Sequence, residues 1–110
     1  MTTLDEAREV ALSLPEATEM DHHGMASFRV RGKIFATVPD DGHLRAMVDE
    51  DETRVLAASE PSSFAEMWWG KRLACVQVEL ASVTPDALRE VLIDAWRRKA
   101  PKRLVRDHDL

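Results

Sequence analysis

The chain has 110 residues, of which 45% are hydrophobic and 32% are charged. This composition excludes a disordered chain, and the length predicts one domain over residues 1–110. Twenty acidic against fifteen basic residues give a net charge of −5, which argues against a strong general polyanion-binding protein.

The first predicted element is a helix over residues 4–14. Thr3 and Glu6 have the spacing of a capping box, and apolar residues recur at helical spacing behind them. Pro15 ends this helix, because proline cannot continue a helical hydrogen-bond pattern.

A β region follows the first helix. Apolar and polar residues alternate, and the turn signals Arg31-Gly32 and Asp40-Asp41-Gly42 separate the β-prone runs. We expect strands over residues 26–31, 33–38 and 44–48, with an edge strand over residues 19–23.

A two-residue turn at Arg31-Gly32 fixes the register of the first hairpin. It pairs Val30 with Lys33 and Phe28 with Phe35, which places the Lys33 stem beside both phenylalanines. The second strand of this hairpin then has apolar residues on both faces. We therefore expect either a bulge or a strand that is covered on both sides.

The second half of the chain has the same kinds of signal. Thr84 and Pro85 cap a last amphipathic helix, which ends before Pro101. Before it we expect a short helix over residues 49–59 and strands over residues 67–69 and 74–80. Short turns join the strands, so the fold class is α+β, a two-layer sandwich with an antiparallel sheet and helices on one face.

Basic residues near the C-terminus are the strongest compositional anomaly. Six bases fall within ten residues without an acid among them: Arg97, Arg98, Lys99, Lys102, Arg103 and Arg106. This basic tail, residues 97–110, is either a phosphate-binding patch or a solvated helix end that offsets the helix dipole. The spacing of Asp94 and Arg98 also predicts an ion pair along the helix.

A second basic set lies on the predicted hairpins and comprises Arg29, Arg31, Lys33 and Arg45. These residues either contact a nucleic-acid backbone or are neutralised by cross-strand acids such as Glu19. Trp68 and Trp69 should point to opposite faces of a strand, one into the core and one toward the surface. A surface tryptophan beside Lys71 and Arg72 can stack on a base or anchor a protein partner.

Catalytic and metal-binding patterns are weak in this sequence. The adjacent His22 and His23 point to opposite faces of a strand, and the spacings of zinc ligands are lacking. Cys75 is single, and no serine lies in a nucleophile-elbow motif. We therefore expect a protein that is not an enzyme and has no cofactor and no metal site.

Three stretches together resemble the MmcQ/YjbR family. They are residues 12–19 (LSLPEATE), residues 28–36 (FRVRGKIFA), and Trp69-Gly70-Lys71 leading into Val76-Gln77-Val78. The resemblance implies a fold similar to frataxin and CyaY, and it implies DNA binding, which is the label that members often carry. The frataxin-like fold also raises iron or metal handling as a less favoured alternative.

These features predict a small cytoplasmic bacterial module that binds DNA weakly and in a salt-sensitive manner. The predicted contacts are Arg29, Arg31, Lys33, Trp69, Lys71, Arg72, Arg97, Arg98, Lys102 and Arg103. We expect a monomer. We also expect no membrane partner, because the first six residues are acidic rather than a basic-then-apolar signal and no apolar run has the length of a bilayer. The alternative is a protein–protein interaction module with an unknown partner.

Overall fold

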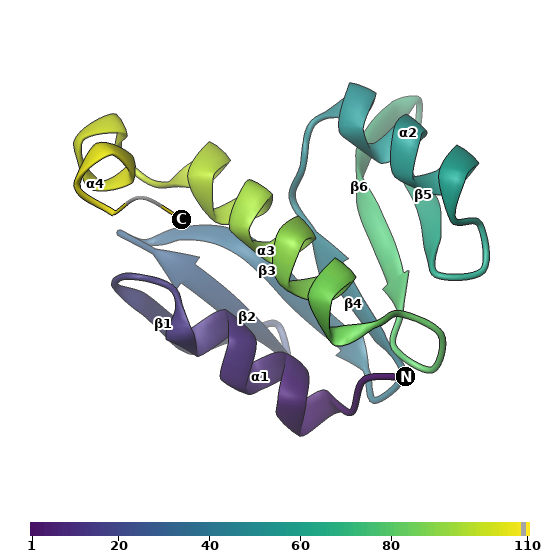
Figure 1. Ribbon diagram of the computed structural model, residues 1–110, viewed down its shortest axis with the longest axis horizontal. Coiled ribbons are helices and arrows are strands. Elements are labelled where there is room, and N and C mark those ends of the chain that lie inside the picture. The colour runs from purple at the N-terminus through teal and green to yellow at the C-terminus, as the bar shows by residue number, and fades with distance from the viewer. Residues whose placement is uncertain (109) are drawn as a thin grey trace.

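The computed structural model describes residues 1–108 and residue 110, and this part contains six strands and four helices (Figure 1). The strands are β1 (Ala17–His22), β2 (Met25–Val30), β3 (Lys33–Asp40), β4 (His43–Ala46), β5 (Phe64–Trp69) and β6 (Arg72–Glu79). The helices are α1 (Leu4–Ser13), α2 (Glu50–Ser59), α3 (Pro85–Lys99) and α4 (Lys102–Asp107).

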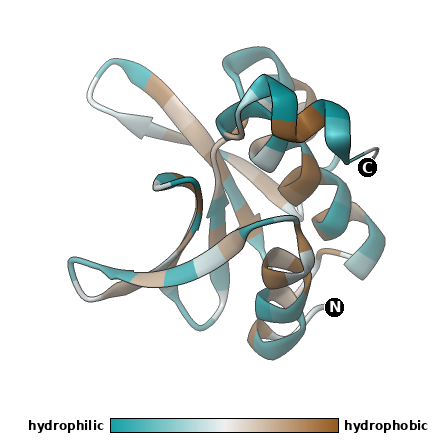
Figure 2. Cartoon of the chain, turned by 90° about the vertical axis from the view of Figure 1, so that its left-hand side faces the viewer, coloured by the Kyte–Doolittle hydropathy of each residue, from teal (hydrophilic) through white to brown (hydrophobic). Residues whose placement is uncertain are grey.

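All six strands form one antiparallel sheet in the order β1-β2-β3-β4-β6-β5. Helices α1 and α3 pack together over the first strands, and α2 packs over β5 and β6, all on the same side of the sheet (Figure 1). Figure 2 shows the helices gathered on one side while the sheet curves away on the other. This arrangement confirms the predicted α+β sandwich.

Within the described residues, none of the helices has the length and apolar character of a membrane-spanning segment.

The capping signals of the sequence form as expected. Thr3 and Glu6 make the reciprocal capping box at the start of α1, and the Thr84 side chain accepts a hydrogen bond from the N–H of Ala87 at the start of α3. Helix α4 was not expected from the sequence, since six residues are too few for a helical period to be recognised. Its Leu104 is buried in the main core.

A β-bulge in the hairpin of β2 and β3 sorts the side chains of β3 between the two sheet faces. Val30 pairs with Lys33 as predicted, but Phe28 pairs with Ala36 rather than with Phe35. The extra residue sends both Phe35 and Ala36 into the helix-covered core, where neither is exposed. The prediction that Lys33 lies beside Phe28 and Phe35 is therefore wrong, and the expected bulge is the correct alternative.

Trp96 is the largest fully buried side chain and joins α3 to the start of the sheet. Its indole N–H donates to the carbonyl oxygen of Pro15 at 2.9 Å, which satisfies the one polar group of the ring. The small Ala7 and Ala11 of α1 are fully buried in the same core and allow α1 to approach closely.

Two acids meet where α2 and α3 face one another. Burial raises the pKa of Glu52 to about 8, and a hydrogen bond with Asp94 and repulsion by Asp94 add to this effect. The predicted ion pair of Asp94 with Arg98 does not form. Arg98 instead donates to the carbonyl oxygen of Met47 at 3.1 Å, which holds the end of α3 to the segment after β4.

We expect Trp96→Phe to lower the free energy of unfolding by about 2 kcal/mol, because it removes the hydrogen bond to Pro15 and leaves a void. Urea denaturation followed by circular dichroism measures this loss. The matched control is Trp68→Phe, which changes an exposed ring and should cost less than about 0.5 kcal/mol. Equal stability of the two variants would contradict the buried role of Trp96.

We expect Glu52→Gln to stabilise the protein at alkaline pH but not at acidic pH. The pKa of Glu52 is raised in the folded protein, so the folded state keeps a proton that the unfolded chain loses once the pH exceeds the ordinary pKa of 4.5. The stability linked to this proton is lost as the pH rises through about 8. The advantage of Glu52→Gln over wild type should therefore grow between about pH 5 and about pH 9, reaching roughly 1 kcal/mol after solvent screening.

The measurement is urea unfolding of both proteins across this pH range. Asp51→Asn, a change at the exposed neighbouring acid, is the control and should follow the wild-type pH profile. Parallel profiles of Glu52→Gln and wild type would contradict the raised pKa.

Candidate functional site

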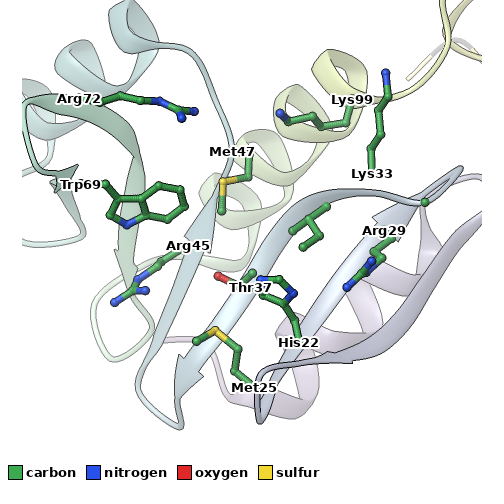
Figure 3. A pocket seen from close by; sticks show the side chains of 12 residues that line it. His22, Met25, Arg29, Lys33, Thr37, Arg45, Met47, Trp69, Arg72 and Lys99 are labelled. Atoms are coloured by element: carbon green, nitrogen blue, oxygen red, sulfur yellow. The ribbon is translucent and has the colours of Figure 1, made fainter.

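A cavity of about 490 Å³ lies on the sheet face opposite the helices (Figure 3). Strands from both halves of the chain and the last residue of α3 surround it. It is lined by His22, Met25, Arg29, Gly32, Lys33, Ile34, Thr37, Arg45, Met47, Trp69, Arg72 and Lys99.

Strand alternation brings two arginines into this cavity. Arg29 on β2 lies between the buried Phe28 and Val30, and Arg45 on β4 lies between the buried Leu44 and Ala46. The Arg29 Nε donates to Ser27 Oγ at 3.2 Å, and the Arg45 Nε donates to Gln77 Oε1 at 3.3 Å. Both guanidinium groups are thus positioned by neutral partners, which leave their positive charge uncompensated.

Trp69 and Arg72 close one side of the cavity from the ends of β5 and β6. The Arg72 guanidinium carbon lies 5.9 Å from the centre of the Trp69 ring, a cation–π contact that steadies both side chains. Trp69 is 50% exposed and Trp68 is 46% exposed. The prediction that one of them enters the core is wrong, because a register shift between Met67 and Trp68 interrupts the alternation at the end of the edge strand.

The cavity lining is strongly cationic. Five of its residues carry a positive charge (Arg29, Lys33, Arg45, Arg72 and Lys99), and within the described chain none of its lining residues is an acid. No ion pair between these five and a described carboxylate is formed. Burial, followed by the charges of Arg98, Arg72 and Lys33, lowers the pKa of Lys99. The cavity lining therefore has an excess of positive charge that suits an anionic ligand.

Four of the ten predicted contact residues line the cavity, namely Arg29, Lys33, Trp69 and Arg72. Arg31 does not, because its guanidinium forms a two-pronged ion pair with Glu16, at 2.5 and 3.0 Å. This pair lowers the pKa of Glu16 and raises that of Arg31. The acid that neutralises a hairpin base is thus Glu16, whereas Glu19 binds Arg8.

The C-terminal bases are divided between different roles. Arg97 donates to the carbonyl oxygen of Leu110, and Arg98 holds Met47 as described above. Lys102 and Arg103 are exposed on α4, Lys71 is exposed in the turn between β5 and β6, and these three lie outside the cavity lining. Of the described residues in the basic tail, Lys99 alone lines the cavity together with the hairpin bases.

The predicted contact set does not include Arg45 and Lys99, although both line the cavity. The sequence does contain a signal for Arg45, because this residue alternates with the apolar Leu44 and Ala46 along its strand. In the structure Arg45 pairs with Gln77 of β6. Lys99 had no such signal, since its position depends on how α3 crosses the sheet. The thioether side chains of Met25 and Met47 were also missed, and no pattern in the sequence places them at the cavity.

The other titratable candidates have structural roles. His43 lies between Asp40, at 2.8 Å, and Glu79, at 2.9 Å; its pKa is raised chiefly by the hydrogen bond with Asp40. The thiol of Cys75 is fully buried, and burial raises its pKa, which disfavours a reactive thiolate. Among the described residues, no group of three or more His, Cys, Asp or Glu side chains could hold a metal ion.

The geometry suits a ligand that has negative charge and a flat apolar part. Arginine forks bind phosphate or carboxylate oxygens in pairs, and an exposed indole offers a stacking surface. Met25, Ile34 and Met47 add apolar side chains to the lining. The described lining thus combines cationic, apolar and aromatic side chains that suit such a ligand.

Comparison with known proteins finds a solved structure with the same fold and a matching family. The chain is similar to the crystal structure of Deinococcus radiodurans protein DR2400, described by the domain family DUF419, with a TM-score of 0.76 and 23% sequence identity. The similarity covers 97% of this chain and 88% of that chain, and at this identity it supports the fold alone. The search of curated proteins found no match. The family model YjbR matches residues 12–98, which include all six strands, α2 and all but the last residue of α3, and the chain therefore belongs to the YjbR family.

Proposed function

We propose that this protein binds nucleic acid, DNA in particular, through the cationic cavity, and that it binds an unpaired strand rather than a duplex. It acts as a monomer in the bacterial cytoplasm and catalyses no reaction. The observation that supports this proposal is the meeting of five uncompensated cations and a half-exposed tryptophan in one cavity.

The shape of the site favours an unpaired strand. A cavity of about 490 Å³ is too small to admit a duplex, whose bases are stacked inside and hidden from Trp69. A single strand can place one base on the indole and its phosphates against Arg29, Arg45 and Arg72. Phosphate contacts set the affinity and carry little sequence information, so the proposed binding is general rather than sequence-specific.

The net charge of −5 limits the strength of this binding. Repulsion between the acidic remainder of the protein and a polyanion lowers the affinity, while the local field of the cavity raises it. Both effects weaken as salt is added, but the contacts in the cavity release counterions from the strand and dominate the salt dependence.

We expect a dye-labelled single strand to bind at low salt, with an affinity that falls as salt rises. Anisotropy titrations with a strand and with a duplex of the same sequence measure this preference. Arg45→Gln should weaken binding and lower the slope of log K against log salt by about 0.7, the value for one phosphate contact on a single strand. Trp69→Ala should cost about 1–3 kcal/mol of stacking.

Two matched variants separate the cavity from the rest of the surface. Arg54→Gln removes an exposed arginine of α2 that pairs with Glu50 at 3.6 Å, and Trp68→Ala removes the exposed tryptophan outside the cavity. Both should bind the strand like wild type. Absence of binding at low salt, binding without a salt slope, or equal losses in the control variants would each refute the proposal.

Protein interaction is the second candidate function, and the exposure of Trp68 favours it. Trp68 lies on the edge strand β5, outside the cavity, and its indole N–H donates to Glu66 at 3.1 Å. An exposed tryptophan on a sheet edge is typical of a partner contact. A pull-down from lysate should then lose a defined partner with Trp68→Ala and keep it with Trp69→Ala. Identical partners for wild type and both variants would exclude this role.

A further inference from the structure

We propose that Lys33 and Lys99 form a subsite for a phosphomonoester, so that the cavity binds the phosphorylated end of a strand more tightly than its interior. This inference rests on the proposed function and adds which part of a nucleic acid the cavity recognises. The ligand class is a nucleotide with a terminal phosphate, either at a strand end or free in solution.

The two lysines come from distant parts of the chain and lie at the same end of the cavity. Lys33 follows the tight turn at Gly32, and Lys99 is the last residue of α3. Figure 3 shows both side chains at the end away from Arg45, with Trp69 and Arg72 on another side. The positive charge of Lys33 contributes to the lowered pKa of Lys99, after burial and the charges of Arg98 and Arg72.

Two like charges held near one another are unfavourable unless an anion lies between them. No described carboxylate forms an ion pair with either lysine. Arg98 and Arg72 add further positive charge around Lys99. This end of the cavity therefore carries positive charge that an anion can offset.

A terminal phosphate offsets this positive charge better than an internal phosphate does. A phosphomonoester has a charge of about −1.5 to −2 at neutral pH and three acceptor oxygens. A phosphodiester within a strand has one negative charge. Each lysine ammonium group has three donors that can rotate, so two of them suit a compact dianion. The planar arginine side chains elsewhere in the cavity suit a pair of oxygens in one plane.

The size of the cavity also favours a chain end. A volume of about 490 Å³ falls within the range of sites that enclose one small ligand, so it can hold one nucleotide and not a run of them. A base stacked on Trp69 leaves its phosphate free to reach the lysine end. The next nucleotide of a strand then leaves the cavity past Arg29 or Arg45.

The test compares strands of one sequence that differ only in their ends. Isothermal titration with a hydroxyl-ended, a 5′-phosphorylated and a 3′-phosphorylated strand measures the preference. We expect one phosphorylated end to bind about tenfold more tightly than the hydroxyl end, the gain expected for one added charge-assisted contact. Lys33→Gln and Lys99→Gln should each abolish this preference, so that phosphorylated and hydroxyl-ended strands bind each variant with equal affinity, although the lost charge weakens the binding of every strand.

Two other variants serve as controls. Lys71→Gln, at an exposed lysine outside the cavity, should keep the preference, and Arg29→Gln should weaken phosphorylated and hydroxyl-ended strands by the same factor. Thymidine monophosphate and inorganic phosphate are titrated as competitors. Displacement by the nucleotide at lower concentration than by phosphate is expected, since only the nucleotide also occupies the indole.

Each outcome decides between the two proposals. Equal affinity for all three strand ends, with the salt slope and the Trp69→Ala loss intact, overturns the phosphate subsite and leaves strand binding in place. Binding of the nucleotide without binding of any strand overturns strand binding and supports the subsite. Absence of binding by strands, nucleotide and phosphate overturns both.

Discussion

The covering of only one sheet face by helices is the constraint on which the rest of the molecule depends. Because α1, α2 and α3 share that face, the period of two along each strand decides which side chains reach the core and which reach the cavity. The bulge in β3 interrupts this alternation. It places Phe35 and Ala36 together in the core, and it leaves Ile34 and Thr37 to line the opposite face.

The charges of the molecule are separated between two regions. Removing the five cavity cations from the net charge of −5 leaves −10 on the rest of the chain. The net charge outside the cavity thus repels a polyanion while the cavity attracts it, which favours ligands that fit inside the cavity. The charge balance of the sequence argues against general polyanion binding, and it remains compatible with this local attraction.

Much of the fold could be predicted from the sequence, because its signals are local. The capping pair Thr3 and Glu6, the turn at Arg31-Gly32 and the stripe that ends at Trp96 each depend on residues within one turn or one helix. The site was predicted only in part. Arg29 and Arg45 follow from alternation, but Lys99 reaches the cavity through the crossing of α3 over the sheet, and Arg31 is occupied by Glu16 from another segment. These are long-range contacts, which periodicity does not encode.

The three tryptophans provide two independent optical signals within one short chain without tyrosine. Trp96 is sealed in the core, so its emission reports whether the chain is folded, whereas Trp69 faces water at the mouth of the cavity and its emission reports what lies against it. Replacing Trp68 with phenylalanine would leave one buried and one exposed indole, whose spectra differ because their surroundings differ in polarity. Fluorescence of the unlabelled protein could then report ligand binding in the cavity and unfolding of the chain separately in one sample.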